Sequence, residues 1–457
     1  MTVIGRGWDR LTLPGKIVFT IVPLLIALTV ALVAVIVVFG APIIDILAAN
    51  LPIVRFVVAV TVVLLMTIPT AFLIIYMEMK IIALMNLRIG PDRVGPFGSL
   101  LSVVHGLKVL MKEDFTPTGA DSLVFTWAPV VVYLASVMSL LVIPFSNGIV
   151  GAELNLGLLY FFAVGGLSVV GLMMAGWSSY NKYSLLGALR AAAQVVSYEI
   201  PLVLSVVGLM LLAGTMNLHQ IVVQQGPVLD QARNVVDRGW FTDWYIFKQP
   251  LGALIFFIAA TAEANRTPFD LTEADSEIVA GFATEYSGMR FGFFFFAEYV
   301  NVFIVSALFV TLFLGGWNAP FPFPAIHVDI DPASFNIGLL FIIGLAPVVL
   351  TLLFAAPFYL LSSRVRWWQA LIAGFVLANL FVVTLLGAWA YIGLDWVAGI
   401  LWFMGETYVF VFTFVWMRGT LPRVRIDQLM GFAWKWLLPA SLLNLFVTAA
   451  AIIVLGR

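Results

Sequence analysis

The sequence predicts an all-α fold, a polytopic bundle of about eleven transmembrane helices whose N-terminus lies in the cytoplasm. Composition, the length of the apolar runs and the placement of basic residues lead to this prediction. Of the 457 residues, 62% are hydrophobic and only 10% are charged, and the mean hydropathy is +1.08. Many apolar runs exceed about 18 residues, so as helices they are long enough to cross a bilayer core of about 30 Å. A transmembrane β-barrel would instead show alternating segments of about ten residues.

The apolar runs define the expected elements in chain order. Each run is read as one helix because it is continuous, and polar or glycine- and proline-rich segments separate it from its neighbours. The eleven candidate spans are about 17–39, 53–77, 124–145, 156–177, 196–217, 246–264, 291–316, 338–362, 368–394, 397–417 and 433–455.

Basic residues fall mostly on one side of these spans. When the connecting segments are assigned alternately to two sides, 18 of the 23 Lys and Arg residues lie on the side of the N-terminus. Cytoplasmic loops carry the excess of Lys and Arg in membrane proteins. The N-terminus and the segments 78–121, 178–195, 264–290 and 418–435 are therefore expected on the inside. The longest outer segment, 219–245, is expected to form an amphipathic interfacial helix.

Composition also limits the chemistry. The chain has no cysteine and only three histidines, so thiolate-bound iron–sulfur clusters are excluded and we predict no metal site or redox centre in this chain. A net charge of −1 gives no bulk electrostatic argument for nucleic-acid binding. The N-terminal apolar run is too long for the core of a cleavable signal peptide.

Carboxylates gather between two of the most apolar runs. The segment 262–290 holds six of the 24 acidic residues. Thr272 and Asp275 fit the start of a helix, which explains some of the acids locally. Glu273 and Glu277 are four residues apart, so on a helix they would repel each other. The segment is therefore either a functional acidic cluster or a solvated loop. Its acids are Glu263, Asp270, Glu273, Asp275, Glu277 and Glu285.

Three other segments place charged residues at the inner ends of spans. Glu199 stands beside Pro201 in "NKYSLLGALRAAAQVVSYEIPL", where an intramembrane carboxylate is costly and is usually functional or paired. The segment 76–117 contains Glu78 and the turn "RIGPDRVGPFG". The segment "RGTLPRVRIDQLM" concentrates Arg418, Arg423, Arg425 and Asp427 at a boundary. Anchoring at the interface explains such charges equally well. Two classes of function fit: a cation transporter with a carboxylate relay, and a membrane subunit that binds a lipid-soluble substrate beside a soluble partner.

Together, four separated motifs in the same order resemble the quinone-chamber membrane subunit of respiratory complex I, the family formed by the H subunit of NADH-quinone oxidoreductase and mitochondrial subunit 1. They are "LRIGPDRVGPFG", "NKYSLLGALRAAAQVVSYEIPL", the acidic segment continued through "FFFFAEY", and "RGTLPRVRIDQLM". The resemblance covers roughly residues 53–316 and 397–455. It implies one integral membrane domain over 1–457, with eight family-like spans and about three extra ones in 1–52 and 317–396.

The resemblance also implies a division of labour. Flavin and iron–sulfur clusters would belong to peripheral-arm partners, and quinone, as ubiquinone or menaquinone, would be the substrate. Antiporter-like and small membrane subunits would be further partners, with membrane lipids around them and no nucleic acid. The location would be a bacterial-type cell inner membrane or an equivalent energy-coupling membrane.

Site residues carried over by the resemblance fall into three groups. Those expected at the quinone cavity and headgroup region are Glu78, Arg88, Arg93, His105, Arg266, Phe269, Asp270 and Arg290. Those expected in a proton relay are Glu199, Glu263, Glu273, Asp275, Glu277, Glu285 and Glu298. The inner-boundary basic motif is Arg418, Arg423, Arg425 and Asp427.

The chain departs from the family pattern at several positions. Met79 replaces an expected arginine, His105 replaces an expected aspartate, and Glu406 lies in a span where no acid is expected. These departures leave open the equivalent subunit of a ferredoxin- or F420-linked quinone reductase. A stand-alone cation or proton transporter remains the alternative of a different class.

Overall fold

The computed structural model describes residues 52–94, 96–147, 149–226, 228–229, 235–237, 243–271, 280–319 and 395–455. Chain contacts define two compact units, one formed by 1–55 with 325–395 and the other by 56–324 with 396–457. The elements and sites below belong to the second unit. The predicted spans 17–39, 338–362 and 368–394 lie outside the described residues.

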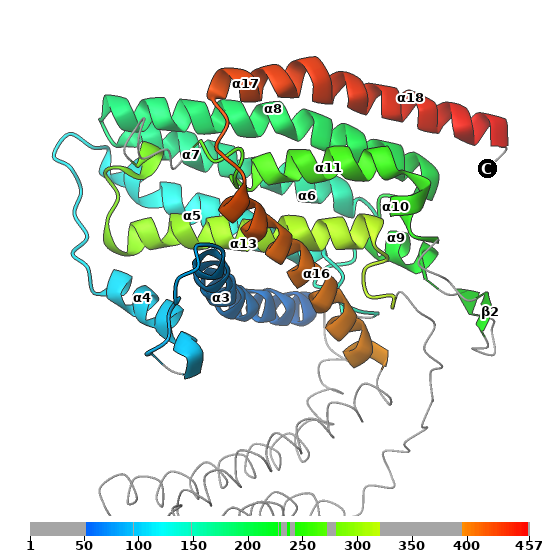
Figure 1. The fold of residues 1–457 in the computed structure, drawn as a ribbon, viewed down its shortest axis with the longest axis horizontal. Coiled ribbons are helices and arrows are strands. Elements are labelled where there is room, and N and C mark those ends of the chain that lie inside the picture. Colours follow the sequence, from blue (N-terminus) through cyan, green and yellow to red (C-terminus); the bar gives the residue numbers. More distant parts are fainter. Residues whose placement is uncertain are drawn as a thin grey trace, which may run out of the picture. The chain divides into compact units, whose positions relative to one another are not determined.

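The described part of the chain is almost wholly helical (Figure 1). Seven of its helical segments are long and apolar enough to cross a membrane, and each coincides with a predicted span. The helices are α3 (Pro52–Met85), α4 (Leu101–Leu110), α5 (Ser122–Ser139), α6 (Gly157–Gly165), α7 (Leu167–Ser178), α8 (Lys182–Ala213), α9 (Leu218–Gln224), α10 (Tyr245–Lys248), α11 (Pro250–Glu263), α13 (Gly288–Phe313), α16 (Asp395–Thr420), α17 (Ile426–Phe432) and α18 (Leu438–Leu455). Short 3₁₀ turns are η1 (Pro96–Gly98), η2 (Leu140–Val142) and η4 (Gly281–Ala283), and η6 (Ala433–Leu437) is a π-helical turn that joins α17 to α18.

The predicted span 246–264 is broken in the structure. Pro250 begins α11, which has 14 residues, and the short α10 precedes it. A 14-residue α-helix is about 21 Å long, shorter than a bilayer core of about 30 Å. Proline lacks an N–H, so it cannot continue the hydrogen bonding of α10 and instead starts a new helix.

The predicted interfacial helix over 219–245 is wrong at 228–229 and 235–237, where the structure has strands. The helix α9 ends at Gln224, and an antiparallel pair of short strands follows, β1 (Val228–Leu229) and β2 (Val235–Asp237). Val228 pairs with Asp237 and Leu229 with Val235. Pro227 and Gly226 stop the helix here, because proline removes a donor and glycine favours turns.

Side-chain caps fix where two of the long helices begin. The Asp121 side chain accepts from the backbone N–H of Leu123 at the start of α5, and Asn181 does the same for Tyr183 at the start of α8. Both residues satisfy donors that the first turn of a helix leaves open. Helix α8 ends at Gly214, whose left-handed backbone (φ 67°) suits glycine.

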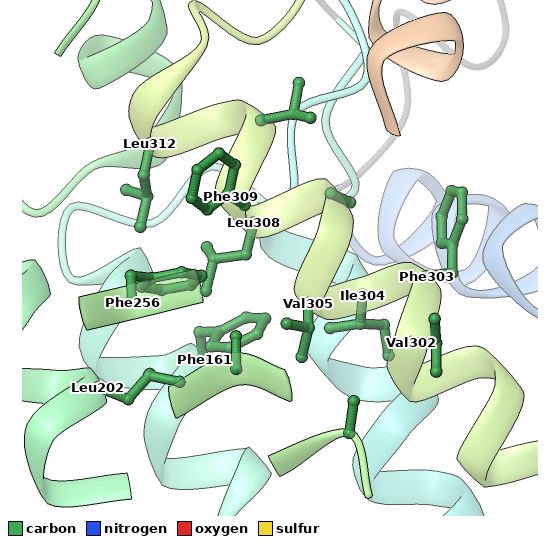
Figure 2. Close-up of a cluster of buried hydrophobic side chains, with 14 of the residues drawn as sticks. Phe161, Leu202, Phe256, Val302, Phe303, Ile304, Val305, Leu308, Phe309 and Leu312 are labelled. Carbon is green, nitrogen blue, oxygen red and sulfur yellow. The ribbon is translucent and has the colours of Figure 1, made fainter. Parts of the chain in front are cut away.

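Helix α13 lies at the centre of the core. Every residue from Val302 to Phe313 is buried, as expected for a helix that is apolar on all sides and surrounded by others. Figure 2 shows its side chains meeting Phe161 of α6, Leu202 of α8 and Phe256 of α11.

The helix α16 crosses this core obliquely in Figure 1, and aromatic contacts hold it in place. Phe410 of α16 packs on Phe309 of α13, with ring centroids 4.3 Å apart, and Phe414 stacks on Phe257 of α11. Helix α8 packs against α7, α11 and α18. The C-terminal ends of α3, α11 and α16 are thereby brought to one place, where the candidate site lies.

Candidate functional site

Glu78, near the inner end of α3, lies between two arginines from distant parts of the chain. Arg266 Nη1 is 3.3 Å from Glu78 Oε2, and Arg418 Nη1 donates to Glu78 Oε1. Arg266 also lies 4.5 Å above the Tyr299 ring. Glu78 and Arg266 are 8% and 3% exposed. A carboxylate this buried requires paired charges, and the three residues form such a cluster, called here the Glu78 ion cluster.

A second ion pair joins the turn after α11 to the link between α16 and α17. Arg423 Nη2 is 3.2 Å from Asp270 Oδ2, and the neighbouring Val424 N–H donates to the Pro268 carbonyl. Asp270 is 4% exposed. The predicted boundary motif is therefore split: Arg418 and Arg423 pair with buried acids, whereas Arg425 and Asp427 are exposed at the start of α17.

A cavity of about 360 Å³ lies between α3, α4 and α13. Glu78 and His105 line it, together with Met79, Lys108 and Tyr299. A second cavity of about 290 Å³, almost entirely apolar, shares Phe72, Gly106, Val109, Gly292 and Phe296 with the first. The two cavities together form one groove, called here the apolar groove. It is apolar along most of its length and charged at one end. Such a groove fits a long apolar molecule with a polar head.

A third cavity, of about 350 Å³, lies on another side of α13 and is called here the acidic cavity. Glu263 and Glu298 line it, with Asn265, Asn301 and the two arginines of the ion pairs. The cavity therefore places two carboxylates and two guanidinium groups around one polar space. Phe291 and Phe295 line both the acidic cavity and the apolar groove, so α13 forms a wall between them.

Two further predicted relay acids, Glu285 and Glu199, are described by the structure but do not line this cavity. Glu285 Oε1 accepts a 2.6 Å hydrogen bond from Asn181 Nδ2 at the start of α8. Glu199 is half-buried on α8, near Gly166 at the break between α6 and α7. Neither residue lines the acidic cavity. Glu273, Asp275 and Glu277 lie outside the described residues.

The remaining predicted headgroup residues do not line the apolar groove. Arg88 and Arg93 are exposed on the turn after α3. Arg290 pairs with Asp114 at 3.2 Å and lies 5.3 Å above the Phe125 ring. None of these three arginines lines the cavities described above, and their place in the headgroup region stays a prediction.

Phe269 is packed in the turn after α11 rather than in the groove. Its ring lies 5.5 Å from that of Tyr198 and 6.5 Å from that of Phe432. Close by, Tyr286 donates to the Phe125 carbonyl. Burial raises the pKa of Tyr286 to about 12, although Ser178 and Arg290 oppose the rise. Tyr286 therefore stays a hydrogen-bond donor at physiological pH.

Sequence reasoning missed the uncharged polar residues of the site. Asn181 holds Glu285, Gln194 binds the turn after α11, and Asn301 lines the acidic cavity. One signal was available: Gln194 follows three alanines inside an apolar helix, where a polar side chain needs partners.

Comparison with known proteins agrees with this architecture. The family model described as NADH dehydrogenase matches residues 56–377 and 368–449. The chain is 41% identical over 378 residues to the H subunit of NADH-quinone oxidoreductase from Brevibacillus brevis, covering 83% of this chain and 87% of the relative.

Two further relatives carry the same name. The Geobacillus kaustophilus protein is 42% identical over 373 residues, covering 81% of this chain and 86% of its own. The Dehalococcoides mccartyi protein is 38% identical over 385 residues, covering 84% and 83%. Both the matched length and the identity exceed what a shared fold alone would give. The chain belongs to the NADH dehydrogenase family.

Proposed function

We propose that this chain is the membrane subunit of a proton-translocating NADH:quinone oxidoreductase in a bacterial cell membrane. In this role it lines the quinone-binding cavity and couples quinone reduction to proton translocation through its glutamates. The relatives are named as subunits of NADH-quinone oxidoreductase. That name favours a subunit over a stand-alone transporter, and NADH over another donor.

The apolar groove supports a quinone as the ligand. Its walls of Phe72, Leu107, Phe293 and Phe296 suit an isoprenoid tail, and its polar end is formed by Glu78 and His105. Burial of an apolar tail contributes roughly 25 cal/mol per Å² of apolar surface. The polar residues at one end would hold the tail with the headgroup toward the ion cluster.

One observation carries the proposed coupling. Glu78 lines the apolar groove, and its ion-pair partner Arg418 lines the acidic cavity on the other side of α13. A change of charge on the bound quinone would alter the balance of this pair. Arg418 would then act on Glu263 and Glu298, because charges interact strongly where water is scarce.

The proposed relay includes acids beyond the acidic cavity. Glu199 and Glu285 would extend it along α8, and the acids of 272–279 would join it to the quinone end. Redox centres would belong to partners, with flavin and iron–sulfur clusters in the peripheral arm. Antiporter-like membrane subunits would receive the protonation change. The complete relay comprises Glu199, Glu263, Glu273, Asp275, Glu277, Glu285 and Glu298.

Obstruction of the apolar groove tests the proposal. A Cβ atom at Gly106 would lie 2.8 Å from ring carbons of Phe72, so Gly106→Leu narrows the groove. In the purified complex we expect the KM for quinone to rise about tenfold, which corresponds to about 1.4 kcal/mol of binding. NADH oxidation by a water-soluble acceptor, which bypasses the membrane, should remain unchanged.

Gly165→Leu is the matched control, because a Cβ atom there would meet nothing within 4 Å. It adds the same side chain away from the groove. An unchanged quinone KM in an assembled Gly106→Leu complex would rule out this groove as the quinone site.

A further inference from the structure

Gln194 of α8 closes the turn that follows α11. Its side chain is 0% exposed. Its Nε2 atom lies 2.7 Å from the Ala262 carbonyl, 2.8 Å from the Phe269 carbonyl and 3.1 Å from Asn265 Oδ1. Ala262 belongs to the last turn of α11, whereas Phe269 lies at the far end of the turn. One amide group therefore joins the two ends of the segment 262–269.

The orientation of this amide follows from its surroundings. Three oxygen atoms face one end of it, and only the NH₂ end can donate to them. Its Oε1 atom is turned away and, within the part of the chain that the structure describes, is buried without a hydrogen-bond partner. In Gln194→Glu, a carboxylate oxygen would replace the NH₂ group and would face three hydrogen-bond acceptors.

The turn that Gln194 holds positions both charged regions of the site. Glu263, at its start, lines the acidic cavity. Arg266, in its middle, reaches Glu78, and Asp270, just beyond it, reaches Arg423. The backbone of Asn265 is left-handed, with φ of 49°, a conformation that asparagine adopts more readily than most residues with a side chain. Gln194 Nε2 lies 3.1 Å from Asn265 Oδ1, so Gln194 also binds the turn at this residue.

We propose that Gln194 is a positioning residue, which fixes the turn 262–269 and so sets the relative placement of the Glu78 ion cluster and the acidic cavity. It touches neither quinone nor the relay carboxylates in this role. The inference rests on the proposed function, because the turn affects catalysis only if these two regions are coupled. The direct consequence of this positioning role is a rigid turn. Hydrogen–deuterium exchange can measure that rigidity without an activity assay.

The test uses two substitutions in the intact complex. Gln194→Met keeps most of the volume and removes the donor, and Gln194→Glu replaces the donor with an acid that can donate only when protonated. Hydrogen–deuterium exchange should speed up at least tenfold for backbone amides in 262–271 in Gln194→Met. Gln220→Glu is the control, because Gln220 is exposed and its Oε1 accepts from Thr215, which a carboxylate can still do.

Quinone reduction coupled to proton pumping provides the second readout. We expect Gln194→Glu to lose activity at least tenfold at neutral pH and to regain part of it as the pH falls, because protonation restores one donor. Wild type and Gln220→Glu should not show this recovery. The charged groups nearest in sequence to Gln194 and its three partners are Arg190, Glu199, Glu263, Arg266 and Asp270. Among the described elements that pack on α8, η6 adds Lys435 and α17 adds Asp427.

The outcomes separate this inference from the proposed function. Unchanged exchange in Gln194→Met overturns the positioning role, whatever the activity. Faster exchange with normal quinone reduction and pumping supports the role of Gln194 in fixing the turn. It counts against the proposed coupling between the Glu78 ion cluster and the acidic cavity. Failure of both variants to assemble overturns the inference, since a residue needed only for folding does not position a reaction.

Discussion

Asn181 has two functions at the start of α8. Its Oδ1 caps the helix by accepting from Tyr183 N–H, while its Nδ2 donates to Glu285. Serine is also a good N-cap, but its one hydroxyl oxygen would have to make both contacts, whereas asparagine uses separate oxygen and nitrogen atoms on a longer side chain. The two functions can therefore be separated by one substitution.

Asn181→Ser should leave assembly intact and reduce coupled quinone reduction up to about tenfold. A hydrogen bond to a charged acceptor contributes about 1.5 kcal/mol, and about 1.4 kcal/mol corresponds to a factor of ten. The measurement is the rate of quinone reduction coupled to proton pumping, in vesicles that contain the intact complex. Asp121→Ser is the control, because Asp121 is also an N-cap and its side chain makes only the cap bonds among the residues that the structure describes. Equal effects of the two substitutions would show that only the cap matters.

At the scale of elements, the Glu78 ion cluster connects α3, the turn after α11 and α16. The sequence separations are 188 residues for Glu78–Arg266 and 340 residues for Glu78–Arg418. Loss of one charge from a buried cluster costs about 3–5 kcal/mol, because the remaining charges lose their compensation.

Glu78→Gln should therefore lower the thermal stability of the complex as well as impair quinone reduction. Gln keeps the size of the side chain but carries no charge opposite the two guanidinium groups. Differential scanning calorimetry of the purified complex measures the change. Asp427→Asn removes an exposed carboxylate from the same inner boundary and should have little effect, as is usual for surface charges. A Glu78→Gln complex as stable as wild type would contradict the role of the cluster in joining these elements.

The apolar runs predicted the described spans well, because span length and hydropathy are local properties of the sequence. Local properties also explain the failure at 246–264, where hydropathy continues across a break that Pro250 creates. Prediction of the site is limited in the same way, because local sequence patterns do not show contacts between distant residues. Arg418 and Asp270 could be identified as unusual charges, but their partners are distant in sequence. Asn181 and Gln194 were missed, since an uncharged polar residue has several local explanations.

At the scale of the whole molecule, the candidate site is concentrated around one part of the central helix α13. The groove, the ion cluster and the acidic cavity all lie around the N-terminal half of α13. In the C-terminal half, the residues of α13 from Val302 to Phe313 are all apolar or hydroxyl-bearing and buried.

The eleven-span topology makes a prediction that single-cysteine labelling can test, because the natural chain has no cysteine. Asp275→Cys and Arg425→Cys should react with a membrane-impermeant thiol reagent only from the cytoplasmic side, and Asp329→Cys only from the outside. Four predicted spans separate positions 275 and 425, so an even number of crossings returns the chain to the same side. If either of the spans 338–362 and 368–394 failed to cross, positions 275 and 425 would label from opposite sides. Labelling of position 329 from the cytoplasm would instead contradict the crossing of α13.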